Sequence, residues 1–257
     1  MSNDTGIGRR RLLAGAATLT GGALLAPALA RPALAGQPRS APRVHPRLDW
    51  QARAPKAAAT VLPTGPDHIV VHHTASENAT DYSLEHAYEL SRSIQKAHMD
   101  DNGWDDIGEQ LTISRGGHLM EGRNLSLDAI ANRQHVVGAH TLGHNSHTIG
   151  IENEGTYMTE TPTPRLLVQL TLTCAWLCRT YDLNPHDAIV GHRDYNNTAC
   201  PGDRLYALLP KLRTAVAAIL SLPRPEHENR PHNDGPRPGP KRRFDHGPAL
   251  ERSSRIR

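Results

Sequence analysis

Three side chains spread along this chain have the chemistry to bind one metal ion. His72 lies near the end of "DHIVVHHTA" (67–75), His192 lies in "AIVGHRD" (188–194), and Cys200 follows in the turn-rich stretch "GHRDYNNTACPGD" (191–203). Zinc is bound by imidazole nitrogen and thiolate sulfur, at about 2.0–2.3 Å. Three protein ligands leave the fourth tetrahedral position to water, as in catalytic zinc sites. Because the chain has 16 histidines, these residue types alone do not establish a site.

Metal ligands need rigid elements to hold them. The sequence predicts strands that contain both His72 and His192. Residues 67–75 form a β-branched run typical of a strand buried on both faces, and 147–155 and 188–194 are two further strands. A Gly-Gly turn divides 111–123 into a hairpin. Helices are expected at 83–99, at 164–181 and at 203–220, where Pro210 should kink or delay the helix. Strands interleaved with helices predict an α/β fold, a central mixed β-sheet flanked by helices.

The two ends of the chain differ in composition from the middle. Residues 1–35 hold an arginine cluster (9–11), an uncharged apolar run and closing A-x-A patterns, which favours a signal peptide. The twin-arginine route is preferred to the general one, and cleavage is preferred to a retained anchor. Residues 222–257 are crowded with Pro, Arg and His, which predicts a disordered tail. One domain is expected at 43–221. We therefore expect a protein secreted into the cell-wall compartment, without stable membrane insertion after cleavage.

Charge and cysteine usage narrow the function further. The net charge of +3 is too small, and too concentrated in the tail, to indicate a nucleic-acid partner. Cys174 and Cys178 lie one helical turn apart on an apolar stretch and are expected in the core. A disulfide between them is an open alternative after export, although it would strain a helix. Cys200 has no evident disulfide partner, which favours a role as a metal ligand.

Four motifs occur in an order that resembles a known family: "VVHHTA", "NGWDDIGEQLTISRGGHLMEGR", "GAHTLGHNSHTIGIENEG" and "GHRDYNNTACPGD". Together they resemble the zinc-dependent N-acetylmuramoyl-L-alanine amidases, which share a fold with peptidoglycan recognition proteins. "LDWQARAP" (48–55) is similar to the Trp-Gly-Ala opening of that family, with Gln51 where glycine is usual. The resemblance covers about residues 45–220 and implies the recognition-protein fold, a Zn²⁺ cofactor and a peptidoglycan or muropeptide substrate.

The resemblance also implies roles for single residues. His72, His192 and Cys200 match the zinc ligands. His73 would then pack on the opposite strand face, although the assignment between His72 and His73 can be reversed on the sequence alone. Thr198 matches a position that polarises the substrate carbonyl.

One departure concerns the general base. Many members carry a tyrosine after "DIG", and here Glu109 stands in its place. "IGIENEG" resembles instead the branch that uses a glutamate in this strand, which Glu152 matches. Glu152 and Glu154 would face the same side of a strand and are expected to form a carboxylate pair. Glu109 is the next candidate for the base.

The family also uses the motifs around Asn145 and Trp104 near its substrate groove. A structural role for either residue is as well supported as substrate contact.

We therefore expect a monomeric zinc enzyme that hydrolyses the amide bond between N-acetylmuramic acid and L-alanine. A peptidoglycan recognition protein that binds without cleaving is the first alternative, and it should lack the zinc cysteine. A second alternative, an unrelated zinc peptidase, is disfavoured because no H-E-x-x-H motif occurs. The third is an α/β domain in which the histidines and the cysteine are incidental.

Overall fold

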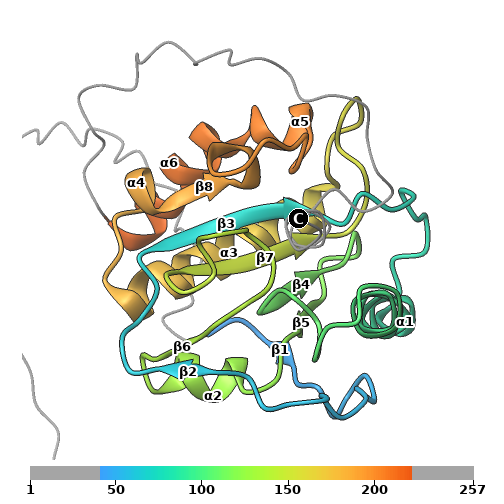
Figure 1. Ribbon diagram of the computed structural model, residues 1–257. Coiled ribbons are helices and arrows are strands. Elements are labelled where there is room, and N and C mark those ends of the chain that lie inside the picture. Colours follow the sequence, from blue (N-terminus) through green and yellow to red (C-terminus); the bar gives the residue numbers. More distant parts are fainter. Residues whose placement is uncertain (1–40, 222–257) are drawn as a thin grey trace, which may run out of the picture. The chain divides into compact units, whose positions relative to one another are not determined.

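The computed structural model describes residues 41–221, so the predicted signal peptide and tail lie outside the described residues. A six-stranded sheet forms the centre of the fold (Figure 1), and its two-residue edge strand β1 (Val44–His45) pairs with β5 (Leu119–Glu121). The order continues through β4 (Leu111–Ile113), β7 (Thr148–Asn153), β3 (His68–His73) and β8 (Ile189–Gly191). Only the β4–β5 pair of this sheet is antiparallel, which confirms both the mixed sheet and the predicted hairpin.

Two helices cover one face of the sheet and form the main core with it. α3 (Pro164–Tyr181) and α6 (Leu209–Leu220) pack against alternate residues of β3 and β7, among them Val71 and Ile151, which are fully buried. Thr163 caps α3 by accepting the N–H of Leu166. Cys174 and Cys178 are buried in this core, as expected, and both are free thiols. Because side chains alternate along a strand, burial of these apolar residues under α3 and α6 places the residues between them on the opposite face of the sheet.

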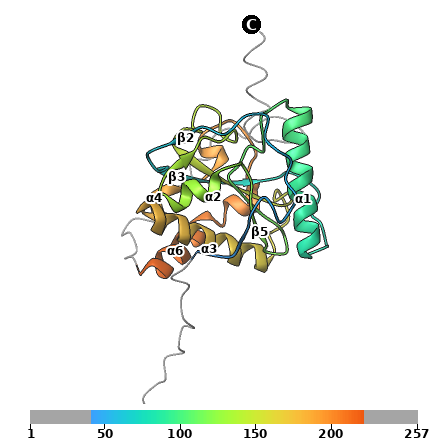
Figure 2. The ribbon, with the colours of Figure 1, turned by 90° about the horizontal axis from the view of Figure 1, so that it is seen from below.

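The remaining helices are short or lie at the side of the sheet. Figure 2 shows α1 (Leu84–Lys96) apart from α3 and α6. Helical structure continues beyond the predicted end at residue 99 through a π-helical turn, η1 (Ala97–Asp101), because the N–H of Asn102 bonds the carbonyl of Ala97. The helix expected at 203–220 is divided into α5 (Asp203–Tyr206) and α6, with Pro210 in the first turn of α6 as its missing N–H favours.

The smaller elements connect these layers. They are α2 (Ser126–Ala131), α4 (Pro185–Ala188), the 3₁₀ turn η2 (His192–Asp194) and a two-stranded sheet of β2 (Val61–Leu62) and β6 (His135–Val136). None of the helices within residues 41–221 combines the length and the apolar character that crossing a bilayer requires.

Candidate metal centre and active site

Strand register places the predicted functional residues in one row across the sheet. His72 of β3 is paired with Glu152 of β7, and Glu152 is paired with Thr112 of β4. On the other side of β3, Val71 is paired with Gly191, so His192 follows directly after β8 beside His72. Registered residues of neighbouring strands face the same side and lie about 4.8 Å apart. The row therefore runs from His192 through His72 and Glu152 to Thr112.

His72, His192 and Cys200 converge at one end of this row. Their ligand atoms all lie within 4.8 Å of one another, and all three residues are fully buried. The sulfur of Cys200 is 3.6 Å from Nδ1 of His72, and the rings of His72 and His192 are 4.5 Å apart. Bonds of about 2.3 Å to sulfur and 2.0–2.1 Å to nitrogen in a tetrahedral site separate the two donor atoms by about 3.6 Å. The donor set and its spacing thus fit a zinc ion.

The tautomer of His192 is set by its neighbour Asn196. The side-chain N–H of Asn196 donates to the carbonyl of Leu142 (3.2 Å), so its Oδ1 accepts from Nε2 of His192 (3.0 Å). The proton of the neutral imidazole therefore resides on Nε2, and Nδ1 carries the lone pair that a metal requires.

His140, which the sequence analysis did not single out, performs the same task for His72. Its Nδ1 lies 3.0 Å from Nε2 of His72, on the side of the ring away from Cys200. Gly150 makes room for the His140 ring, since a Cβ there would lie 2.7 Å from its Cγ. Asn145 holds the loop, because its Oδ1 accepts the N–H groups of His140 and Thr141 (2.8 and 2.9 Å). These bonds give Asn145 a structural role, and its contact with substrate stays a prediction.

We expect His140→Ala to weaken zinc binding about 10- to 100-fold, because metal-binding histidines depend on such outer partners for orientation and basicity. Competition with a chromophoric chelator measures this affinity. His118→Ala, in the turn between β4 and β5, removes an imidazole elsewhere and serves as the matched control. Unchanged affinity in His140→Ala would mean that His72 is oriented without His140.

The loop that carries Cys200 is fixed by backbone bonds. The N–H of Arg193 donates to the carbonyl of Cys200 (3.1 Å), and Oγ1 of Thr198 accepts the N–H of Cys200 (3.1 Å). Gly202 adopts φ +90°, and a Cβ there would lie 2.5 Å from the backbone of Tyr157. Thr198 is thus buried directly beside the candidate metal ligands.

The structure also distinguishes His72 from His73. His73 points away from the cluster, and its Nδ1 accepts the N–H of Tyr157 (3.3 Å). Its backbone N–H lies 3.3 Å from the sulfur of Cys200, a contact that favours a thiolate. The geometry therefore supports His72 as the metal ligand of the two.

Glu152 is the carboxylate nearest to the cluster in the register. It is 1% exposed, and within residues 41–221 no group hydrogen-bonds to either of its carboxylate oxygens. Burial, with repulsion from Glu109 as a second cause, raises the pKa of Glu152 well above its usual value. A buried carboxylate without protein partners is costly unless water, a cation or a substrate group meets it.

The carboxyl group that acts electrostatically on Glu152 is that of Glu109 and not that of Glu154, which corrects the expected pairing. Glu154 lies one residue beyond β7, where its carboxylate accepts from Nε2 of His86 (2.5 Å) and from the N–H of Arg115 (2.6 Å). Glu109 is fully buried, and Oγ1 of Thr112 donates to its Oε1 (2.9 Å). Burial raises the pKa of Glu109 to about 7. The two buried carboxyl groups therefore disfavour each other's ionisation.

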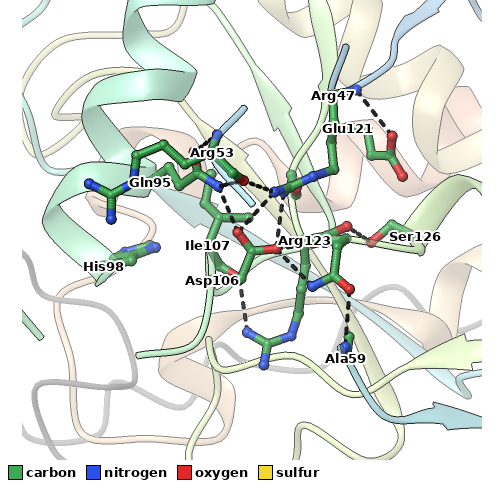
Figure 3. A network of polar contacts seen from close by, with 12 residues as sticks. Arg47, Arg53, Ala59, Gln95, His98, Asp106, Ile107, Glu121, Arg123 and Ser126 are labelled. Carbon is green, nitrogen blue, oxygen red and sulfur yellow. Dashed lines mark hydrogen bonds and ion pairs between the residues drawn. The ribbon is translucent and has the colours of Figure 1, made fainter. Parts of the chain in front are cut away.

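Asp106 anchors the segment that carries Glu109. Figure 3 shows Asp106 surrounded by Arg47, Gln95 and their neighbours. Arg47 forms an ion pair with Asp106 at 3.0 Å, and Nε2 of Gln95 donates to its Oδ1 at 2.8 Å. Asn124 donates both its backbone and side-chain N–H to Oδ2 (2.9 and 2.8 Å). This network fixes the backbone three residues before Glu109.

The metal-free wild-type protein should lose stability as the pH rises, and Glu109→Gln should abolish this loss. The folded-state pKa of about 7 lies above the ordinary glutamate value of 4.5, so folded Glu109 retains its proton over a range where the unfolded chain releases it. The stabilisation is complete below about pH 4.5 and is lost as the pH rises through about 7. Below about pH 4.5, the variant and the wild type should therefore have the same free energy of unfolding. Above about pH 7, the free energy of unfolding of the variant should be higher by about 3 kcal/mol.

Urea unfolding of chelator-treated protein across this pH range measures the difference. Glu89→Gln, on the exposed side of α1, is the matched control. A difference that does not change with pH would contradict the raised pKa of Glu109.

A cavity of about 300 Å³ reaches Glu152 from the side of α1. Its walls are the segment 74–77 after β3, the inner face of α1, and the side chains of His98 and Glu152. Trp104 packs on the ring of His98, with 4.6 Å between the ring centroids. A Cβ on Gly108 would lie 3.0 Å from the Trp104 side chain. Trp104 therefore supports the wall of the cavity through His98, and the three candidate metal ligands lie outside its lining.

Comparison with known proteins relates this architecture to one family. The family model described as N-acetylmuramoyl-L-alanine amidase matches residues 62–203. A human protein named N-acetylmuramoyl-L-alanine amidase is 36% identical over 187 residues, which cover 71% of this chain and 30% of the human protein. The chain spans about 30% of the length of the curated amidases that it matches.

Solved structures agree with the sequence matches. Wild-type Drosophila PGRP-LB is 30% identical with a TM-score of 0.56, covering 64% of this chain and 91% of that one. Peptidoglycan recognition protein-LE, solved in complex with tracheal cytotoxin, is 28% identical with a TM-score of 0.57, covering 65% and 92%. The fold of residues 41–221 is therefore the one shared by these proteins.

Proposed function

Because the chain belongs to the N-acetylmuramoyl-L-alanine amidase family, we propose that it hydrolyses the amide bond between N-acetylmuramic acid and L-alanine in peptidoglycan, with a zinc ion bound by His72, His192 and Cys200. The observation that carries the proposal is the row described above. It sets a buried carboxylate without protein partners, Glu152, one strand away from three converging metal-binding side chains.

A zinc ion held by His72, His192 and Cys200 would supply a Lewis acid for the substrate carbonyl and would lower the pKa of water. Glu152 is assigned as the general base that takes a proton from the attacking water. The new bond forms between the water oxygen and the lactyl carbonyl carbon, and the carbon–nitrogen bond to L-alanine breaks. Glu152 then delivers its proton to the departing amine, which is a poor leaving group until it is protonated.

Two further residues support this chemistry. Thr198 is assigned to the carbonyl oxygen as a hydroxyl donor, which stabilises the charge that develops there. Glu109 shares the buried environment of Glu152, and its raised pKa keeps it protonated more often than an exposed glutamate. A cation beside His72 favours the ionised form of Glu152, which a base requires.

Binding without cleavage is the alternative, because recognition proteins are among the relatives. Incubating the purified protein with a defined muropeptide and measuring product masses separates the two. The proposal predicts one product with a free lactyl carboxylate on the sugar and one free peptide that begins with L-alanine. An unchanged muropeptide that the zinc-loaded protein nevertheless binds would establish recognition alone.

Export, a cell-wall location, the monomeric state and the exclusion of nucleic acid stay predictions. Export suits the proposed substrate, because peptidoglycan lies outside the cytoplasmic membrane. Recovering the mature chain from culture medium or wall fractions would test this.

A further inference from the structure

A second cluster of metal-binding side chains lies at the opposite end of β3 from His72. Asp67 and His68 stand at the start of β3, and His147 directly precedes β7. The N–H of Asp67 donates to the carbonyl of His147 (2.9 Å), which brings the side chains to the same edge of the sheet. Since a strand rises about 3.3 Å per residue, His68 lies about 13 Å from His72 along β3. The two clusters are therefore separate.

The donor atoms of this cluster converge on a single carboxylate oxygen. Nδ1 of His68 and Nδ1 of His147 each lie 2.7 Å from Oδ1 of Asp67, and the three donor atoms lie within 4.8 Å of one another. The side chains of Asp67, His68 and His147 are 62%, 33% and 37% exposed, so an ion can enter from solvent.

An outer layer of aromatic rings fixes the orientation of His147. Nδ1 of His144 lies 3.1 Å from Nε2 of His147. The ring of Tyr195, from the loop after η2, stacks on His144 with centroids 4.2 Å apart and 29° between the planes. Metal-binding histidines usually donate the N–H that faces away from the metal to such a partner. The cluster therefore has a second layer of support from another part of the chain.

We propose that Asp67, His68 and His147 form a second binding site, for a divalent transition-metal cation such as Zn²⁺. Two imidazole nitrogens and a carboxylate oxygen are donors that suit this class of ion. In a tetrahedral site, bonds of about 2.0–2.1 Å separate nitrogen and oxygen donors by about 3.3–3.4 Å. The side chains must therefore move apart by about 0.6 Å, which exposed groups can do.

No proton has to leave the cluster when the ion binds. Each neutral imidazole shifts its proton from Nδ1 to Nε2, and Nδ1 then donates its lone pair to the cation. For His147, the proton on Nε2 is then donated to Nδ1 of His144 across the contact of 3.1 Å, while His144 shifts its own proton from Nδ1 to Nε2. The hydrogen-bonded cluster and the metal site thus share one set of partners.

Such an ion would tie two parts of the chain together. It would join the start of β3 to the loop before β7, which also carries His140. Ligands that bind only the folded state raise its stability. We therefore assign this site a stabilising role, distinct from hydrolysis.

Counting zinc ions bound by the full chain in equilibrium dialysis tests the proposal. The Cys200→Ser variant is used as the background, so that the first site does not contribute. Adding His147→Ala to this background should lower the number of bound zinc ions by one per chain, and adding Asp67→Asn should do the same. Adding His118→Ala, the matched control, should leave the number unchanged.

Thermal unfolding provides a second readout. Excess zinc should raise the Tm of the Cys200→Ser protein and should not raise it once His147→Ala is added. Asp67→Asn changes no side-chain volume at an exposed position, so it remains informative if the histidine variant folds poorly. Equal zinc counts in the background and in both variants would overturn the proposal, whatever the outcome at the first site.

Discussion

Glu152→Gln is expected to lower the rate of muropeptide hydrolysis about 10²- to 10⁴-fold, the usual contribution of a general acid–base group. Glutamine has nearly the same shape but cannot accept and return a proton. Because Glu152 faces the cavity and is not one of the converging ligands, the variant should retain the zinc content of wild type. The measurement is kcat/KM on a defined muropeptide, with zinc determined by elemental analysis of the same sample.

Two comparisons sharpen this result. Glu89→Gln on the exposed side of α1 should match wild type in both rate and metal content. If Glu152→Gln keeps nearly full activity with zinc bound, the base is another residue. Glu109 is then the first to test, because its buried carboxylate is the charge that, after burial itself, raises the pKa of Glu152.

Cys200→Ser is expected to lose the zinc ion of the first site together with activity, with hydrolysis reduced by about 10³-fold or more, since a metal's Lewis acidity contributes several kcal/mol. A serine hydroxyl keeps its proton near neutral pH and does not replace a thiolate. The position is fully buried, so solvent cannot supply a substitute ligand easily. Zinc content and hydrolysis should fall together.

The matched control removes a thiol that lies in the core. Cys178→Ala, in α3, should keep the zinc content of wild type while losing some stability. A Cys200→Ser protein that retained a full equivalent of zinc at the first site would show that the sulfur is not a ligand.

The sequence predicted the sheet from local patterns, and the motif resemblance pointed to the three candidate metal ligands. The β-branched run at 67–75 and the Gly-Gly turn within 111–123 are local signals for a strand and a hairpin. The strand register confirms both elements. The motif resemblance placed His72, His192 and Cys200, which the structure brings within 4.8 Å. Pro210 likewise marked the start of α6.

Other features depend on contacts between distant segments and could not be predicted. The pairing of Glu109 with Glu152 arises because β4 and β7 are neighbours, and strand order was not readable from the sequence. Glu154 was paired with Glu152 on strand alternation, but β7 ends at Asn153 and His86 of α1 binds the Glu154 carboxylate. His140 belongs to the motif "GAHTLGHNSHTIGIENEG", but its contact with His72 joins residues that are far apart in sequence. The motif alone therefore did not reveal this contact.

The measurement that tests the central claim most directly is zinc X-ray absorption spectroscopy on the protein loaded with one equivalent of zinc. We predict one sulfur at about 2.3 Å and two imidazole nitrogens at about 2.0–2.1 Å, with a light atom from solvent in the remaining position. The sulfur signal should vanish in Cys200→Ser. A zinc environment of nitrogen and oxygen alone in the wild-type protein would contradict the site described here.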